Sequence, residues 1–112
     1  MEPIARKARN YRNAAGKSPF REWITRKIDG RSRNRIVARI RRIEEFGNYG
    51  DCAPVGGGVL ELKFDTGPGF RVYFGIDGAE MILLCGGDKS TQKSDIKRAR
   101  ECWDDYNAEA ND

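Results

Sequence analysis

Hydrophobic positions near the N-terminus recur at the spacing of an α-helix. Ser18 is followed by Pro19, and this pair predicts a helix start, because a serine oxygen caps free N–H groups and proline fits the first turn. The apolar positions that follow are Phe20, Trp23, Ile24 and Ile28. The Asp-Gly pair at 29–30 interrupts this pattern and predicts the end of the helix.

A second helical pattern begins near Arg31 or Ser32 and ends by Gly47. Its apolar face consists of Ile36, Ile40 and Ile43. At about 100° per residue, four arginines share the roughly opposite face: Arg31, Arg35, Arg39 and Arg42. The isoleucines are predicted to be core, and the arginine stripe is predicted to be exposed and able to bind phosphates, ribosomal RNA or acidic side chains.

The middle of the chain alternates in the manner of β-strands. Alternation predicts strands at 59–64 and 70–76, and a nearly continuous apolar run at 79–85 predicts a central third strand. The Asp77-Gly78 pair is typical of a two-residue hairpin turn. The glycine-rich residues 47–58 predict a long loop.

The C-terminal segment again has helical spacing. A last helix is predicted to begin between Ser90 and Lys93, and residues 106–112 are predicted to fray. Its apolar positions are Ile96, Ala99, Trp103 and Tyr106. The order of elements, with an extended opening piece, two helices, three strands and a helix, predicts one α+β domain over 1–112 with an antiparallel sheet.

The register of the first hairpin gathers four polar side chains. Opposed residues of an antiparallel pair point to the same face, and the short turn at 65–69 sets Lys63 opposite Arg71 and Glu61 opposite Tyr73. All four are therefore predicted to lie on the outward face of the sheet. Arg71 can hold phosphate oxygens, Lys63 can neutralise charge or move a proton, and Tyr73 can donate a proton or stack on a base. Taken alone, these residues favour the simpler interpretation, ordinary cross-strand stabilisation.

The amino-acid composition limits which side chains could bind a metal or act as acids and bases. The 112-residue chain has no histidine and only three cysteines, far apart, which argues against a zinc site, and we expect no metal or other cofactor. Acid–base chemistry would then rely on Lys, Arg, Tyr, Asp or Glu. No apolar run approaches the roughly 20 residues of a membrane span, and no secretory signal begins the chain, so we expect no membrane contact and a reducing cytoplasm.

The charge is divided unevenly along the chain. Residues 1–50 carry 14 Lys or Arg against five Asp or Glu, whereas residues 51–112 carry seven against 12. A basic half is typical of a protein that binds nucleic acid or an acidic partner. A solvated helical surface explains the same charge, and the degree of asymmetry leaves the two interpretations about equal.

The stretch LLCGGDKSTQKSDIKRA, residues 83–99, superficially resembles a phosphate-binding loop. A Walker loop needs glycine directly before its lysine, but here Asp88 precedes Lys89, so we reject a nucleotide site. The stretch instead joins the third strand to the last helix. Lys89 is left at the edge of the sheet, where it either reaches toward the Arg71 face or remains a solvated loop lysine.

Three blocks, SPFREWITRKIDGRSRNRIVARIRRIEEFGNYGD, VLELKFDTGPGFRVYF and LLCGGDKSTQKSDIKRA, resemble the RelE/ParE/HigB-type toxin superfamily of bacterial toxin–antitoxin pairs. The chain is most similar to the branch called addiction-module killer proteins, and the resemblance covers residues 18–99. It implies a compact α+β toxin, usually monomeric, with two N-terminal helices packed on an antiparallel sheet. It also implies a cognate antitoxin.

For the RelE- and HigB-like members, the resemblance implies ribosome-dependent mRNA cleavage without a metal, in which a 2′-hydroxyl attacks the adjacent phosphate. Arg71 matches the strand arginine of the family motif, and Lys63 matches the basic residue of the preceding strand. Tyr73 and Lys89 are carried over as further catalytic candidates.

The chain departs from this pattern in two ways. It lacks the histidine common in HigB-like members, and the outward face of its third strand carries only Ile82 and Leu84. Because ParE-like members share the fold yet inhibit DNA gyrase, a non-enzymatic gyrase inhibitor is an alternative. A degenerate toxin that only binds its antitoxin, or DNA, is another.

Overall fold

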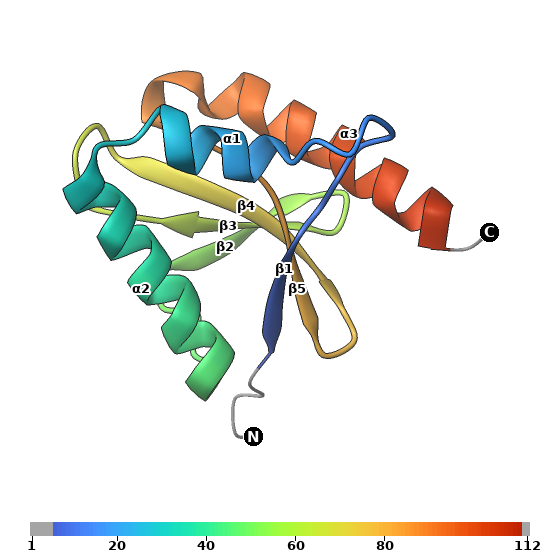
Figure 1. The fold of residues 1–112 in the computed structure, drawn as a ribbon, viewed down its shortest axis with the longest axis horizontal. Helices are drawn as coiled ribbons and strands as arrows, with labels where there is room; N and C mark the ends of the chain where they lie inside the picture. The colour runs from blue at the N-terminus through green and yellow to red at the C-terminus, as the bar shows by residue number, and fades with distance from the viewer. Residues whose placement is uncertain (1–5, 111–112) are drawn as a thin grey trace.

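A five-stranded sheet forms the centre of the protein, in the spatial order β1-β5-β4-β3-β2 (Figure 1). The computed structural model describes residues 6–110. Its elements along the chain are β1 (Lys7–Asn10), α1 (Pro19–Arg26), α2 (Gly30–Phe46), β2 (Cys52–Gly56), β3 (Val59–Lys63), β4 (Phe70–Asp77), β5 (Glu80–Asp88), the short 3-10 helix η1 (Lys89–Thr91) and α3 (Gln92–Ala110). The α+β class predicted from the sequence is confirmed.

The two N-terminal helices begin where capping residues occur. The Ser18 side chain accepts the backbone N–H of Arg21 at the start of α1, and Asp29 accepts that of Ser32 at the start of α2. Gly47 ends α2 in the left-handed conformation, with φ 73°. Both helices pack on one face of the sheet, where their apolar stripes meet the inward residues of β3, β4 and β5. The main members of this first core are Phe20, Ile24, Ile36, Ile40, Ile43, Leu62, Val72, Phe74 and Met81.

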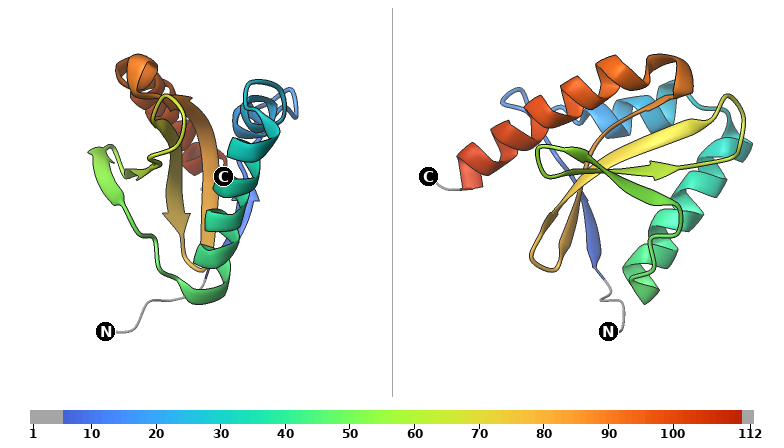
Figure 2. Two further views of the ribbon diagram at one scale, coloured as in Figure 1. Left: turned by 90° about the vertical axis from the view of Figure 1, so that its left-hand side faces the viewer. Right: turned by 180° about the vertical axis from the view of Figure 1, so that it is seen from behind.

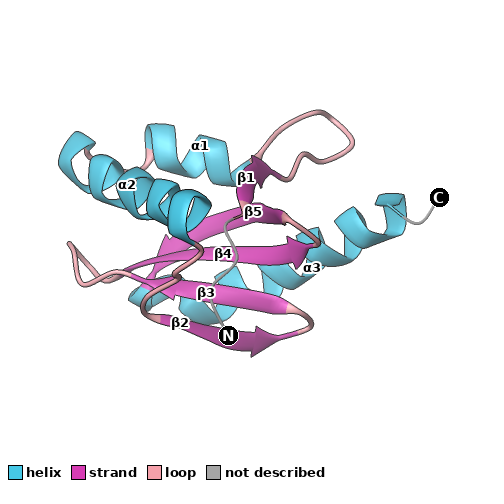
Figure 3. Cartoon of the chain, turned by 90° about the horizontal axis from the view of Figure 1, so that it is seen from below, coloured by secondary structure: helices cyan, strands magenta, loops and turns pink. Residues whose placement is uncertain are grey.

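The strand register agrees with the prediction for the first hairpin. Lys63 pairs with Arg71, and Glu61 pairs with Tyr73. The three pairs β2–β3, β3–β4 and β4–β5 are antiparallel (Figure 3). The opening piece, β1, instead pairs with β5 in parallel, so the sheet is mixed at this edge.

One strand was missed by the sequence prediction. Residues 47–58 were predicted to be a loop, yet β2 lies within this range and pairs with β3. Its composition suggested a loop because Pro54 and three consecutive glycines interrupt it. An edge strand tolerates proline, since one row of its backbone N–H groups has no partner strand.

The face predicted to be outward is covered by α3. Figure 2 shows α1 and α2 on one side of the sheet and α3 on the other. Between α3 and the sheet lies a second core, made of Tyr11, Val59, Tyr73, Ile82, Leu84, Cys85, Ala99 and Trp103. The prediction of an outward face was therefore wrong, and Tyr73 has 0% of its surface exposed. The apolar Ile82 and Leu84 belong to a core rather than to an exposed strand.

The predicted fraying of the tail was wrong for residues 106–110. The helix α3 continues to Ala110, because Tyr106 stacks on Trp103 with ring centroids 5.2 Å apart and donates a hydrogen bond to Asp77. Residues 111–112 lie outside the described part of the chain. Within residues 6–110, no helix has the length and apolar character needed to cross a membrane.

Close contact between α3 and the sheet depends on Gly75. A Cβ atom at this position would lie 2.5 Å from ring atoms of Trp103, which is too near for any real contact. We expect Gly75→Ala to lower the free energy of unfolding by about 1–3 kcal/mol, because the indole must shift out of a packed site. Urea denaturation followed by tryptophan fluorescence measures this change.

Gly30→Ala is the matched control. A Cβ at Gly30 meets no heavy atom within 4 Å, and the residue begins α2, where alanine has the higher helix propensity. The free energy of unfolding of Gly30→Ala should equal that of the wild type or exceed it by up to about 1 kcal/mol. If Gly75→Ala were as stable as Gly30→Ala, the close packing of Trp103 on the sheet would be refuted.

Candidate functional site

A cavity of about 470 Å³ opens beside the β3–β4 turn. Three of the four residues predicted to be catalytic line it, namely Lys63, Arg71 and Lys89. The other lining residues are Asp51, Phe64, Asp65, Gly67, Pro68 and Gly69. The sequence prediction did not include the two aspartates, although the position of Asp65 two residues after Lys63 was a usable signal. The cavity thus combines three cationic side chains with two carboxylates.

Arg71 is the most unusual of these residues, because it is buried and its guanidinium pairs with no carboxylate of residues 6–110. The residue is 8% exposed. Its Nη1 donates to the backbone carbonyls of Gly69 and Phe70, each at 3.1 Å, and its Nε has no hydrogen-bond partner among the described residues. A buried charge without a counterion is costly, so this site is well suited to bind an anion.

The two lysines reach the cavity from different elements. Lys63 ends β3, is half-buried and lies across the ladder from Arg71. Lys89 begins η1 and is exposed, and its backbone N–H donates to the carbonyl of Gly69 at 3.1 Å. Gly69 leaves room for the Lys89 stem, because a Cβ there would lie 2.9 Å from its Cγ and Cδ. This turn therefore fixes both Arg71 and Lys89.

Tyr73, the fourth candidate, does not line this cavity. Its hydroxyl is buried and has no hydrogen-bond partner in the described structure. Burial, and then the neighbouring Glu61 carboxylate, raise the pKa of the phenol well above its usual value of 10. The Glu61 carboxylate in turn accepts a hydrogen bond of 2.8 Å from Gln92 of α3. Tyr73 is consequently a neutral phenol enclosed under the first turn of α3.

The arginine stripe of α2 divides into exposed and structural members. Arg31 and Arg42 are exposed, as predicted. Arg35 is also exposed, and its Nη1 donates to the Thr66 hydroxyl in the β3–β4 turn at 2.9 Å. Arg39 differs, and the prediction that it is a free surface cation was wrong.

The guanidinium of Arg39 joins three backbone segments. It donates to the carbonyl of Tyr49 at 2.8 Å, to that of Asp51 at 2.8 Å and to that of Lys63. It also lies over the Phe64 ring, 4.6 Å from the centroid. Burial lowers the pKa of this arginine, and its N–H groups are used for these bonds. Arg39 therefore supports the cavity wall at Asp51 and Lys63.

The donor groups of the chain give no evidence for a metal centre. Within residues 6–110, no group of three or more Cys, Asp or Glu side chains is arranged to hold a metal ion. The cysteines Cys52, Cys85 and Cys102 are all free thiols. Burial raises the pKa of the Cys85 thiol to about 12, so it is not an activated nucleophile.

Comparison with known proteins gives two matches. Residues 23–103 match the family described as "Phage derived protein Gp49-like (DUF891)". A protein of Haemophilus influenzae described as uncharacterized is 48% identical over 82 residues, which are 72% of this chain and 82% of the relative. The family stands in the context of RelE-like toxins and their antitoxins, which agrees with the resemblance at this coarser level.

The position of Arg39 leads to a stability prediction. We expect Arg39→Ala to lower the free energy of unfolding by about 2–4 kcal/mol, because charged hydrogen bonds to backbone carbonyls are lost together with the contact on Phe64. Arg42→Ala, on the exposed side of the same helix, should change it by no more than about 0.5 kcal/mol. Urea denaturation of both variants checks this, and equal stabilities would contradict a structural role for Arg39.

Proposed function

Because the chain belongs to the Gp49-like family, we propose that it is the toxin of a type II toxin–antitoxin pair and that it cleaves mRNA on the ribosome. The observation that carries the proposal is the buried Arg71, which forms no ion pair within residues 6–110 and lines a cavity with Lys63 and Lys89. A scissile phosphate has the charge and the acceptor oxygens that this arrangement lacks.

The proposed reaction is an internal phosphoryl transfer. The 2′-oxygen of one nucleotide forms a bond to the adjacent phosphorus, the bond to the 5′-oxygen breaks, and a 2′,3′-cyclic phosphate is left on the upstream fragment. One proton leaves the 2′-hydroxyl and one proton is delivered to the departing 5′-oxygen. Charge on the phosphoryl oxygens increases in the transition state, and fixed cations near those oxygens lower its free energy.

The residues of the cavity have different roles in binding the phosphate, neutralising charge and transferring protons. Arg71 binds the phosphoryl oxygens, since it lines the cavity and is held in place by its bonds to the two carbonyls at 3.1 Å. Lys63 neutralises the developing charge from the neighbouring strand, and Lys89 approaches from η1 on the solvent side. The chain has no histidine, so the proton transfers then involve the lysines, the carboxylates of Asp51 and Asp65, or water.

Binding of the RNA chain needs a wider basic surface. The exposed Arg31, Arg35 and Arg42 extend along α2, and Arg35 reaches the turn that borders the cavity. These arginines can contact phosphates on either side of the scissile one, a sequence-independent mode of binding. We further propose that the toxin acts in the cytoplasm, is monomeric when free, and is neutralised by a cognate antitoxin.

One observation favours a second candidate function. Tyr73 is buried under α3, so the cavity contains three cations and two carboxylates but neither tyrosine nor histidine. A ParE-like protein that inhibits DNA gyrase by contact alone would need no acid–base group. In that case substitutions in the cavity would leave toxicity unchanged.

The proposed function predicts that Arg71→Ala abolishes cleavage. The protein would be added to a translating cell-free bacterial system, and primer extension would locate cuts in the mRNA. Cuts should appear only while ribosomes translate, and Arg71→Ala should lower their rate by about 100-fold or more, as loss of a fixed transition-state donor does. Lys97→Ala, an exposed α3 variant away from the cavity, should cut normally.

The outcomes of this experiment separate the candidate functions. Circular dichroism should confirm that Arg71→Ala is folded. If the wild-type protein leaves the mRNA intact but blocks DNA supercoiling by purified gyrase, the ribonuclease proposal fails and the second candidate stands. If the folded Arg71→Ala variant still cuts at the wild-type rate, the assignment of Arg71 is wrong.

Tyr73→Phe tests whether the buried phenol takes part. We expect this variant to retain cleavage within about threefold of the wild type, because acid–base catalysis contributes about 100-fold or more where it operates and Tyr73 does not line the Arg71 cavity. A loss of that larger size in a folded variant would show that Tyr73 acts in the reaction and that the first turn of α3 moves when RNA binds.

A further inference from the structure

Asp95 is a buried carboxylate in the first turn of α3, and it does not line the Arg71 cavity. The residue is 9% exposed. A carboxylate in such a position needs hydrogen bonds that replace those to water. Its Oδ2 accepts the hydroxyl of Thr91, and its Oδ1 lies 3.5 Å from Nη2 of Arg98. These two contacts are the side-chain partners of the carboxylate within residues 6–110.

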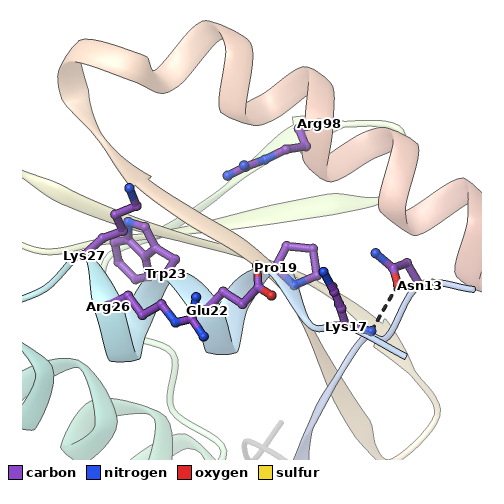
Figure 4. A pocket seen from close by; sticks show the side chains of 8 residues that line it. All are labelled: Asn13, Lys17, Pro19, Glu22, Trp23, Arg26, Lys27 and Arg98. Carbon is purple, nitrogen blue, oxygen red and sulfur yellow. Dashed lines mark hydrogen bonds between the residues drawn. The ribbon is translucent and has the colours of Figure 1, made fainter. Parts of the chain in front are cut away.

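The contact with Arg98 is the weaker of the two. The Arg98 side chain is 49% exposed and extends from α3 toward α1, where it borders a cavity of about 500 Å³ (Figure 4). Its Nη2 also donates to the backbone carbonyl of Gly86 at 3.2 Å. Because a partly exposed ion pair of this length contributes little to stability, the main partner of the Asp95 carboxylate is Thr91.

The sheet makes room for this carboxylate at Gly87. A Cβ at Gly87 would lie 1.8 Å from Oδ2 of Asp95 and 2.9 Å from Oγ1 of Thr91. Gly87 is also the residue of β5 that pairs with Arg71. Paired residues of antiparallel strands share a face, so the hydrogen bond between Thr91 and Asp95 lies over the sheet at the strand position next to Arg71.

Thr91 belongs to the same short helix as Lys89. Asp88 caps the start of η1, because its side chain accepts the Ser90 N–H at 2.8 Å while the Thr91 hydroxyl oxygen accepts the Asp88 N–H at 3.3 Å. The Thr91 hydroxyl is in turn held by Asp95. This hydroxyl therefore closes the turn that begins at Lys89.

Lys89 needs such support because it lies beside another cation. A Cβ at Gly69 would lie 2.9 Å from Cγ and Cδ of Lys89 and 3.6 Å from Nη1 of Arg71, so the two side chains border the same point. Like charges this close repel each other, and neither forms an ion pair within residues 6–110. The position of Lys89 therefore depends on the backbone of η1, whose first N–H donates to the Gly69 carbonyl at 3.1 Å.

We propose that Asp95 is a positioning residue that holds Lys89 beside Arg71 through the Thr91 hydroxyl. The bond from Thr91 to Asp95 fixes the last residue of η1, and the Gly69 carbonyl fixes the first. The Lys89 stem is thereby directed into the cavity that Arg71 lines. This inference rests on the proposed cleavage, in which Lys89 supplies charge at the phosphate, whereas Asp95 touches neither the phosphate nor the cavity.

The first test is a double-mutant cycle for mRNA cleavage in the translating cell-free system. Lys89→Ala and Asp95→Ala should each lower the cleavage rate about 10- to 100-fold, because a small displacement of a positioned group costs about that much. The double variant should be no more than about twofold slower than Lys89→Ala alone, because Asp95 acts through the lysine. A merely structural loss would instead multiply the two effects.

Three further variants separate the hydrogen bond from the charge. Asp95→Asn keeps an oxygen that accepts the Thr91 hydroxyl, and it should cleave within about threefold of the wild type. Thr91→Val removes the hydroxyl from the other side, and it should be as slow as Asp95→Ala. Asp104→Ala removes an exposed carboxylate from the same helix and should cleave at the wild-type rate.

Hydrogen exchange of the Lys89 backbone amide measures the same placement without RNA. The ¹⁵N-labelled full chain would be compared with its Asp95→Ala variant. The variant should exchange the Lys89 amide at least about tenfold faster, because η1 opens and the bond to the Gly69 carbonyl is lost, whereas the Trp103 amide in the middle of α3 should change less than about twofold.

Four results would overturn the proposal. These are unchanged exchange at Lys89 in a folded Asp95→Ala variant, a Lys89→Ala variant that cleaves at the wild-type rate, multiplying effects of the two alanine substitutions, and an Asp95→Asn variant as slow as Asp95→Ala. If the wild-type protein cleaves no mRNA, the ribonuclease function fails, and the exchange measurement alone decides whether Asp95 holds Lys89 in place. The two failures are therefore distinguishable.

Discussion

The packing of Trp103 against Gly75 determines how the rest of this structure is arranged. The indole lies where the sheet has no side chain, and it brings α3 down onto a face that would otherwise be solvated. The sheet then has a core on each side instead of one. The polar residues that alternate with the first core, Glu61 and Tyr73 among them, become enclosed. Arg71, two positions along β4 from Tyr73, lies where this cover ends, so its charge is buried while a cavity beside it stays open.

Basic residues in this protein serve two purposes that composition cannot separate. Arg39 is used internally, because it satisfies carbonyl groups of three segments that converge at the end of β3. Among residues 6–110, in contrast, Arg71 donates to two local carbonyls and its buried Nε has no partner. Electrostatic attraction for an anion therefore depends on which donors remain unused and not on the count of positive residues. Because Arg39 holds the backbone of Asp51 and Lys63, the structural arginine also maintains the position of the candidate site.

The parity and register of the strands could be predicted from the sequence, because alternation and a short turn define them within a few residues. Lys63 opposite Arg71 and Glu61 opposite Tyr73 follow from such local rules. What covers each face depends on contacts between distant segments. The apolar stripe of the last helix could be predicted from the sequence, but no local sequence feature shows that the Trp103 ring packs against Gly75. The parallel pairing of β1 with β5 was not predicted from the sequence, and neither was the edge strand β2. The reason is the same, because each is defined by its partner strand and not by its own residues.

The enclosure of Tyr73 bears on the kind of catalysis this fold can support. A phenol whose pKa is raised by burial and by Glu61 is a poor base, and beneath α3 it cannot donate to a bound phosphate. With no histidine in the chain, catalysis in the observed arrangement rests on fixed cations that stabilise the transition state. One well-placed donor is worth about 100- to 1,000-fold in rate, and this is the scale of the contribution that the proposed ribonuclease function assigns to Arg71. Under the proposed function, the ribosome would position the substrate and the protein would supply charge at one phosphate.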